Sequence, residues 1–405
     1  MHKGNVIIGQ SGGPTSVINA SLTGVVEACR DVADVTGIYG MRWGIEGFLA
    51  SDVVNLSKES KAAIRLLRRT PSSALGSSRH KVKEADLPII VDRLRAFDIH
   101  GLFMIGGNDT MDTVHRVTAY AESQGYPLTG IGIPKTVDND LYGTDHTPGY
   151  PSAARFTALS VQQAGVLARD MQKVDQFIIY QSIGRDAGWL TASAALARQD
   201  EADAPHLIYM PERPLDPQRF LADVEDAHRR FGYVSIVCGE GIKYADGTPV
   251  SASQTRDAFA NLEYGAMAGT SVAMNLHRII SKQFGWRGEF QITESLPMSA
   301  IDRATKGDLD EAYLCGQAAV KLAAEGKSGL MVTLERTSND PYACTTGTAA
   351  LADVAVRAKP MPGEMINAAG NYPTGAFLDY LQPLVGELPK FARLKYKKAK
   401  PALQK

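Results

Sequence analysis

Acidic and small residues gather in two short turns of this chain. Asp109 lies in GGNDTMDT (106–113), and Lys135, Asp138 and Asp140 lie in PKTVDND (134–140). One carboxylate of the second turn can take a proton from an attacking hydroxyl, and the other can hold or orient Mg²⁺. A lysine is a compact cation suited to a phosphate. DND alone is typical of a polar turn, but the two turns together indicate phosphoryl transfer.

Further glycine-rich stretches could bind an anion. GQSGGPTS (9–16) follows an apolar run and precedes a helical pattern, so its backbone N–H groups can converge on a phosphate. The two glycines of GGNDT let the backbone approach a phosphate closely, because no Cβ intervenes. Neither stretch matches the dinucleotide or P-loop pattern, which counts against a nicotinamide-dependent oxidoreductase.

Short apolar runs precede these turns. NVIIGQ, GLFMIGG, LTGIGIP, QFIIYQ and YVSIVCG are continuous runs that favour strands buried on both faces. Helical patterns alternate with them, which predicts an α/β fold. Because the polar turns follow presumed strands at the edge where ligands bind in open parallel sheets, we expect two Rossmann-like sheets facing a shared cleft. DLDE (308–311) has the spacing of a capping box and predicts a helix start.

Composition excludes several classes of function. A length of 405 residues favours two domains, and a formal net charge of -1 argues against binding to nucleic acid or an anionic membrane surface. No apolar stretch approaches the ~20 residues of a membrane helix. A strand pattern begins almost at the N-terminus and leaves no room for a signal peptide. We therefore expect a cytoplasmic protein.

Ordered motifs over most of the chain resemble the phosphofructokinase family. They are GQSGGPTSVINAS, LGSSR, GGNDT, PKTVDND, TPGYPSA, SIGRDAGWLTASAALA, CGEG and LPMSAIDRA. The resemblance implies that Asp138 is the base that deprotonates the 1-hydroxyl of fructose 6-phosphate, with Asp140 at the second acidic position. It also implies that Arg185 steadies the charged transition state and that Glu240 holds sugar hydroxyls.

The same resemblance implies the remaining binding positions. On the donor side they are Gly12, Gly13, Arg79, Asp109, Lys135 and Thr136, of which Thr136 would also contact the transferred phosphoryl group. On the sugar-phosphate side they are Ile183, Gly184 and Arg303. Arg303 would clamp the 6-phosphate, although the family signature there ends in Gln-Arg and this chain has Asp302-Arg303.

Two positions separate the donors used within the family. ATP-using members have glycine at both, and pyrophosphate-using members have the aspartate and lysine that stand here as Asp109 and Lys135. A carboxylate at 109 would intrude on the α-phosphate of ATP and repel it. Lys135 could pair with Asp109 or with the terminal phosphate of a small, highly charged donor. The resemblance therefore implies a Mg²⁺-dependent, reversible enzyme that uses pyrophosphate and fructose 6-phosphate.

Two alternatives remain open. In an ATP-dependent enzyme, the Asp109–Lys135 pair would only shape the loop. In a non-catalytic regulatory paralogue, the chain would bind sugar phosphate without chemistry. The support for the second is Asn108, where the family usually has aspartate, because an amide is a weaker Mg²⁺ ligand. The metal would then depend on Asp109, Asp140, water and pyrophosphate.

The resemblance also implies the domain organisation. Residues 1–147 with about 305–335 would form the donor domain, and residues 148–304 with about 336–405 would form the fructose 6-phosphate domain. Family members form homodimers or homotetramers, so we expect one of these assemblies.

Overall fold

Two β-sheets organise the residues that this computed structural model describes, which are 1–78, 80–252 and 269–399. The larger sheet has the strand order β11-β10-β5-β4-β1-β2-β3, and the smaller has the order β7-β8-β6-β9. Neighbouring strands are parallel except in the pairs β2–β3 and β10–β11. The prediction of an α/β fold with two parallel sheets is confirmed.

The strands form where the sequence has its apolar runs. Those of the larger sheet are β1 (Gly4–Gln10), β2 (Val35–Met41), β3 (Val53–Asn55), β4 (Ile99–Gly106), β5 (Thr129–Pro134), β10 (Leu330–Asn339) and β11 (Tyr342–Ala350). Those of the smaller sheet are β6 (Phe177–Ser182), β7 (Leu207–Tyr209), β8 (Val234–Gly239) and β9 (Gly288–Ile292). The central strands β4, β5, β6 and β8 are almost wholly buried, because helices cover both faces of each sheet.

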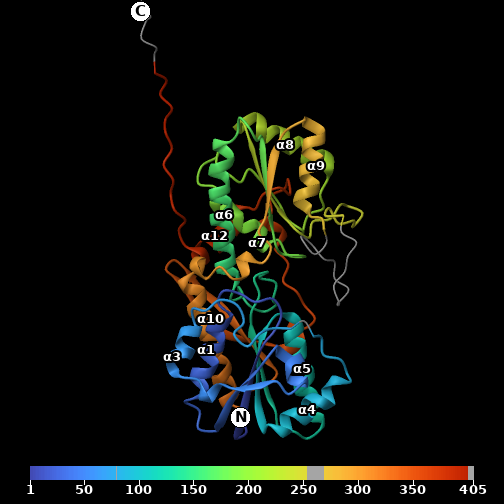
Figure 1. Ribbon diagram of the computed structural model, residues 1–405, viewed down its shortest axis with the longest axis vertical. Coiled ribbons are helices and arrows are strands. Elements are labelled where there is room, and N and C mark those ends of the chain that lie inside the picture. Colours follow the sequence, from blue (N-terminus) through green and yellow to red (C-terminus); the bar gives the residue numbers. More distant parts are fainter. Residues whose placement is uncertain (79, 253–268, 400–405) are drawn as a thin grey trace, which may run out of the picture.

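The two sheets lie in two lobes, stacked along the long axis of the molecule (Figure 1). In the first lobe, α1 (Ile18–Cys29), α3 (Lys61–Leu67) and α10 (Lys306–Ala324) cover one face, and α2 (Gly44–Leu49), α4 (Asp86–Ala96), α5 (Asn108–Ser123) and α11 (Leu351–Val354) cover the other. In the second lobe, α6 (Tyr150–Asp170), α7 (Trp189–Ser193) and α12 (Gly375–Val385) lie opposite α8 (Pro217–Phe231) and α9 (Val272–Phe284). None of the helices in these described ranges combines the length and the apolar character of a bilayer span.

Close packing places α10 beside α1. A Cβ on Gly24 of α1 would lie 2.2 Å from the carbonyl oxygen of Tyr313, and a Cβ on Gly316 of α10 would lie 2.2 Å from that of Ser21. Glycine at both positions lets the two backbones touch. This contact joins a late segment of the chain to the helix that follows the first glycine-rich loop.

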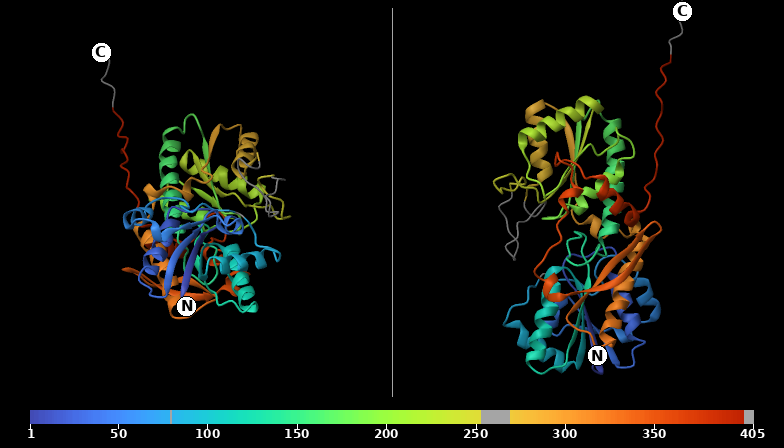
Figure 2. Two further views of the ribbon diagram at one scale, coloured as in Figure 1. Left: turned by 60° about the horizontal axis from the view of Figure 1, so that its bottom comes forward. Right: turned by 180° about the vertical axis from the view of Figure 1, so that it is seen from behind.

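The predicted domain boundary near residue 336 is wrong. β11 pairs with β10 along its whole length in the larger sheet, and Leu351 and Val354 of α11 are buried in the same lobe. A boundary at 335 would cut this hairpin, which lies at the edge of the sheet (Figure 2, right). The chain reaches the second lobe later, where Phe377 and Leu381 of α12 join its core. The other boundaries stay predictions.

The capping box predicted at residues 308–311 is also wrong. α10 begins earlier, and the Thr305 side chain accepts a hydrogen bond from the Asp308 backbone N–H at 3.1 Å. The Asp308 carboxylate instead accepts hydrogen bonds from the backbone N–H groups of Gly149 and Ser152, at 2.8 and 3.0 Å. It therefore caps α6, the helix that leads into the second lobe.

A buried histidine of the second lobe makes stability depend on pH. His206 is 6% exposed, and burial lowers its pKa from 6.5 to about 4. As the pH falls, the unfolded chain therefore binds a proton at His206 before the folded chain does. The contribution of neutral His206 to stability is complete above about pH 6.5, and it decreases as the pH falls to about 4. We expect the loss from this group to be about 2 kcal/mol at about pH 5. Urea denaturation of the wild type and of His206→Gln, above about pH 6.5 and at about pH 5, measures this loss in the free energy of unfolding. An equal pH dependence of the two proteins would contradict the assignment.

Candidate active site

Three of the predicted donor residues, Gly12, Gly13 and Lys135, meet at the carboxyl ends of β1 and β5. Lys135 directly follows β5 and is 4% exposed, and its Nζ donates a hydrogen bond of 2.6 Å to the carbonyl oxygen of Gly13. Gly12 adopts φ +75°, and a Cβ there would lie 3.3 Å from Nζ of Lys135. The ammonium group therefore lies against the first glycine-rich loop, where a phosphate bound by that loop would meet it.

Ser77 and Ser78 contact Gly12 of the first glycine-rich loop. The Ser77 hydroxyl donates to the carbonyl oxygen of Gly12 at 2.6 Å. Arg79, predicted to bind the donor phosphate, lies outside the described residues. Its role stays a prediction.

The turn that carries Asp138 and Asp140 has an unusual backbone. Asn139, between them, adopts φ 57° and is fully buried. Its side chain is held on both sides, because Oδ1 accepts from the Thr147 N–H at 3.0 Å and Nδ2 donates to the Tyr380 hydroxyl at 2.9 Å. Asparagine tolerates the left-handed conformation better than most residues. The central residue of DND is therefore structural, and it orients the two aspartates.

Lys135 and the two aspartates interact electrostatically. Burial and the nearby Asp140 raise the pKa of Asp138, while Arg185 and Lys135 act in the opposite direction. Burial likewise raises the pKa of Asp140. Burial lowers the pKa of Lys135 to about 8, against the effect of the two carboxylates. A carboxylate whose proton affinity is raised by burial is a stronger base, as general-base catalysis requires.

The predicted sugar-phosphate residues come from the second lobe and face this turn. A Cβ on Gly184 would lie 3.9 Å from Oδ1 of Asp138. The Gly184 N–H donates to Oε1 of Glu240 at 3.2 Å, and burial together with Asp138 raises the pKa of Glu240 to about 7. Arg185 is exposed beside them. The structure thus brings Asp138, Gly184, Arg185 and Glu240 together between the two sheets.

The Arg185 loop rests directly on the turn after β8. A Cβ on Gly241 would lie 1.4 Å from the carbonyl oxygen of Arg185, so the backbone must move to accept any side chain there. We expect Gly241→Ala to lower kcat at least about tenfold, since a shift of ~1 Å in a reacting group can cost ~10²-fold. Steady-state kinetics test this, with Gly375→Ala as control, because no atom of the described residues lies within 4 Å of a Cβ at position 375 and the backbone there is not left-handed. Equal kcat values for Gly241→Ala and the wild type would contradict it.

Asp109 and Asn108 begin α5. The Asp109 side chain is 85% exposed, and its Oδ1 lies 3.9 Å from Nζ of Lys81. Within the described ranges, no ion pair joins Asp109 to Lys135. Lys135 thus pairs with the Gly13 carbonyl oxygen and not with Asp109, and its contact with a donor phosphate stays a prediction. Oδ1 of Asn108 is buried and has no hydrogen-bond partner among the described residues.

Among the remaining predicted residues, Thr136 contacts Asp138, whereas no recorded hydrogen bond within the described ranges joins Arg303 or Ile183 to the Asp138–Glu240 group. Nη1 of Arg303 donates to the Ser160 hydroxyl at 3.1 Å, and its guanidinium lies 5.0 Å from the ring centroid of Phe156. Ile183 is half-buried against the core of the second lobe. Thr136 accepts a hydrogen bond from the Asp138 N–H at 3.1 Å. The 6-phosphate clamp at Arg303 stays a prediction.

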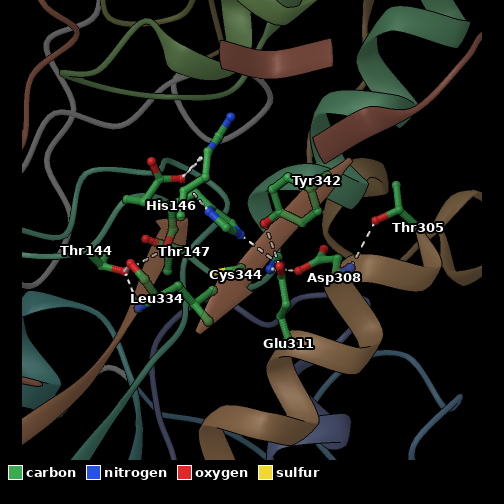
Figure 3. Close-up of polar contacts among 12 residues, drawn as sticks. Thr144, His146, Thr147, Thr305, Asp308, Glu311, Leu334, Tyr342 and Cys344 are labelled. Carbon is green, nitrogen blue, oxygen red and sulfur yellow. Dashed lines mark hydrogen bonds and ion pairs between the residues drawn. The ribbon is translucent and has the colours of Figure 1, made fainter. Parts of the chain in front are cut away.

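Several polar residues that the sequence analysis did not identify contact the segment that follows the DND turn. Figure 3 shows buried His146 between two carboxylates, with Nδ1 2.8 Å from Asp145 and Nε2 2.8 Å from Glu311 of α10. The Tyr342 hydroxyl of β11 donates to Glu311 at 2.5 Å. Nη2 of Arg336 in β10 donates to Asp145 at 2.9 Å. The segment after the DND turn is thus held by Arg336 of β10 and Glu311 of α10, and the neutral Tyr342 hydroxyl of β11 supports Glu311.

Comparisons with known proteins agree with this arrangement. The sequence profile of the family described as "Phosphofructokinase" matches residues 5–303. A pyrophosphate–fructose 6-phosphate 1-phosphotransferase of Halomonas elongata is 40% identical, over 97% of both chains. A sulfofructose kinase of Alkalicoccus urumqiensis is 34% identical, over 82% of this chain and 83% of its own.

A solved structure is also similar. The crystal structure of a pyrophosphate-dependent phosphofructokinase from Marinobacter aquaeolei superposes with a TM-score of 0.86 at 35% identity, and the match covers 99% of this chain and 98% of that one. The family profile spans the strands, the turns and the loops that form the site, and the relatives match nearly from end to end. The chain belongs to the phosphofructokinase family.

Proposed function

We propose that this chain is a pyrophosphate–fructose 6-phosphate 1-phosphotransferase. It transfers a phosphoryl group from pyrophosphate to the 1-hydroxyl of D-fructose 6-phosphate, giving fructose 1,6-bisphosphate and orthophosphate, and it runs in both directions. The observation that carries the proposal is Lys135, a buried ammonium group held on the donor loop by Gly13 and facing Asp138 and Asp140. The name of the Halomonas elongata relative supports the same donor and acceptor.

The residues of the site divide the reaction between them. Asp138 accepts the proton of the sugar 1-hydroxyl as that oxygen attacks a phosphorus of pyrophosphate, and the bond to the bridging oxygen breaks. Lys135 and Arg185 stabilise the charge on the transferred group, because phosphoryl transfer depends on positioning and on nearby cations. Glu240 binds sugar hydroxyls, and the negative charge of Asp109 repels the α-phosphate of ATP.

Mg²⁺ fits the donor side of this site. The buried, unpartnered Oδ1 of Asn108 and the Asp140 carboxylate are hard oxygen ligands, and Asp109 stands beside Asn108. Among the described residues, no group of three or more histidine, cysteine, aspartate or glutamate side chains could hold a metal by itself. We infer that Asp140, Asp109 and Asn108 share the ion with pyrophosphate and water. When bound, Mg²⁺ neutralises charge on the donor.

A cytoplasmic location, expected from the sequence, and a homodimeric or homotetrameric assembly, implied by the family resemblance, complete the proposal. No feature of the described chain favours one assembly over the other.

A donor comparison tests the proposed function. Purified protein receives Mg²⁺ and fructose 6-phosphate with either pyrophosphate or ATP, and fructose 1,6-bisphosphate is measured. Product with pyrophosphate alone is expected. Product with ATP alone would favour the ATP-dependent alternative, and no product from folded protein with either donor would favour the non-catalytic paralogue.

A further inference from the structure

A late segment of the chain runs directly behind the catalytic turn. Ala358 forms an isolated antiparallel bridge with Leu141, and the Lys359 N–H donates to the carbonyl oxygen of Asp140 at 2.7 Å. This segment links α11 of the first lobe to α12 of the second. It therefore crosses between the lobes where the Asp138 turn and the Arg185 loop approach each other.

The Lys359 ammonium group is surrounded by oxygen atoms of the turn. Its Nζ donates to the carbonyl oxygens of Asp145 and Thr144, at 2.7 and 3.1 Å, and to Oδ1 of Asn139 at 3.4 Å. An ammonium group has three N–H donors, and all three find an acceptor here. Lysine is rarely buried without such partners, because its desolvation costs free energy.

The other side of the same residue contacts the second lobe. The Trp189 Nε1–H donates to the carbonyl oxygen of Lys359 at 3.1 Å, and Nζ of Lys359 lies 5.1 Å from the centroid of the Trp189 ring. Oε1 of Glu212 accepts from the Gly188 N–H at 2.7 Å and from the Met361 N–H at 3.3 Å. Gly188 and Trp189 directly follow GRDA, the loop that carries Arg185.

We propose that Lys359 is a positioning residue that fixes the Asp138 turn relative to the Arg185 loop. It contacts neither substrate in this assignment. It acts through Asn139 and Asp140 on one side and through Trp189 on the other, so that the base and the arginine from different lobes keep one geometry. This role rests on the proposed function, because positioning matters only where Asp138 and Arg185 serve the same reaction.

Kinetics of Lys359→Met test the proposal. Methionine keeps much of the length and removes the ammonium group. We expect kcat to fall about tenfold to a hundredfold with pyrophosphate and fructose 6-phosphate, because a small misplacement is costly. Both KM values should stay within about threefold, since no substrate contact is lost. Lys327→Met is the matched control, because Lys327 is an exposed lysine whose recorded ion pair is with Glu325, outside both segments.

A second readout does not depend on activity. Hydrogen–deuterium exchange should become faster in residues 136–147 and 184–190 of Lys359→Met, and it should stay unchanged there in Lys327→Met. An inactive wild type would refute the proposed function, whereas the exchange result would still decide whether Lys359 holds the two segments.

Trp189→Phe covers the case in which Lys359→Met does not fold. It keeps an aromatic ring and removes the Nε1–H donor, and it should lower kcat several-fold with unchanged KM and faster exchange in the same two segments. A kcat within twofold of wild type together with unchanged exchange, in either folded variant, would overturn the proposal. A kcat loss in Lys359→Met no larger than in Lys327→Met would also overturn it.

Discussion

Asp138→Asn should lower kcat about 10²–10⁴-fold, the range that a positioned general base contributes. Asparagine has the same shape but cannot accept the hydroxyl proton. KM for fructose 6-phosphate should change little, because the contacts proposed for the sugar are mainly with Glu240 and the second lobe. Steady-state kinetics in the forward direction measure the effect.

Stability separates this loss from misfolding. The Asp138 carboxylate is charged in a buried place near Asp140, and its pKa is raised accordingly. Removing the charge should therefore leave the thermal midpoint unchanged or slightly higher. Asp226→Asn, on the exposed surface of α8, is the matched control and should retain wild-type kcat. A kcat of Asp138→Asn within tenfold of wild type would rule out Asp138 as the base.

Lys135→Met should lower kcat with pyrophosphate by about 10²–10³-fold, the usual cost of removing one preorganised group that stabilises transition-state charge. The ammonium group is buried against Gly13 and near both aspartates, so neither solvent nor another described cation can replace it at that position. Kinetics at saturating pyrophosphate measure the loss.

Lys81→Met is the control for this variant. Lys81 pairs with Asp109 at 3.9 Å and is 62% exposed, so its removal changes the charge of the same region without emptying the buried position. We expect Lys81→Met to change kcat by less than about threefold, in line with the small worth of exposed pairs. Equal losses of kcat in the two variants would mean that Lys135 contributes only its positive charge to the region, and not a specific position.

Three of the motifs can be placed in the fold from the sequence because each follows a buried strand. Gly12, Lys135 and Glu240 come directly after β1, β5 and β8, and the carboxyl edges of parallel strands bring such turns together. The apolar runs therefore predicted both the strands and the shared edge. The family resemblance supplied the role of each residue, which strand periodicity alone could not.

Side-chain partners were less predictable. The charge on Lys135 suggested Asp109, but the structure gives Lys135 a backbone carbonyl and gives Asp109 the exposed Lys81. The local sequence does not indicate which partner each side chain has. The direction in which each turn leaves its strand decides which groups meet. For the same reason, Asp308 fits a local capping box by spacing and in fact caps α6.

Lys359 was missed for a different reason. It lies 220 residues from Asn139, in a segment without a recognisable motif, and its contacts are mostly with backbone carbonyls. Backbone acceptors carry no sequence signal. The one available hint was a lysine-proline pair between two helical patterns, which is also typical of an ordinary exposed loop.

The reverse reaction is the most direct measurement of the proposed chemistry. Fructose 1,6-bisphosphate, orthophosphate and Mg²⁺ are supplied without any nucleotide, and phosphorus NMR follows the formation of pyrophosphate. The wild type should produce pyrophosphate and fructose 6-phosphate, and Asp138→Asn should produce neither at a comparable rate. No pyrophosphate from folded wild-type protein, or equal rates for the two proteins, would contradict phosphoryl transfer between fructose 1,6-bisphosphate and orthophosphate at this site.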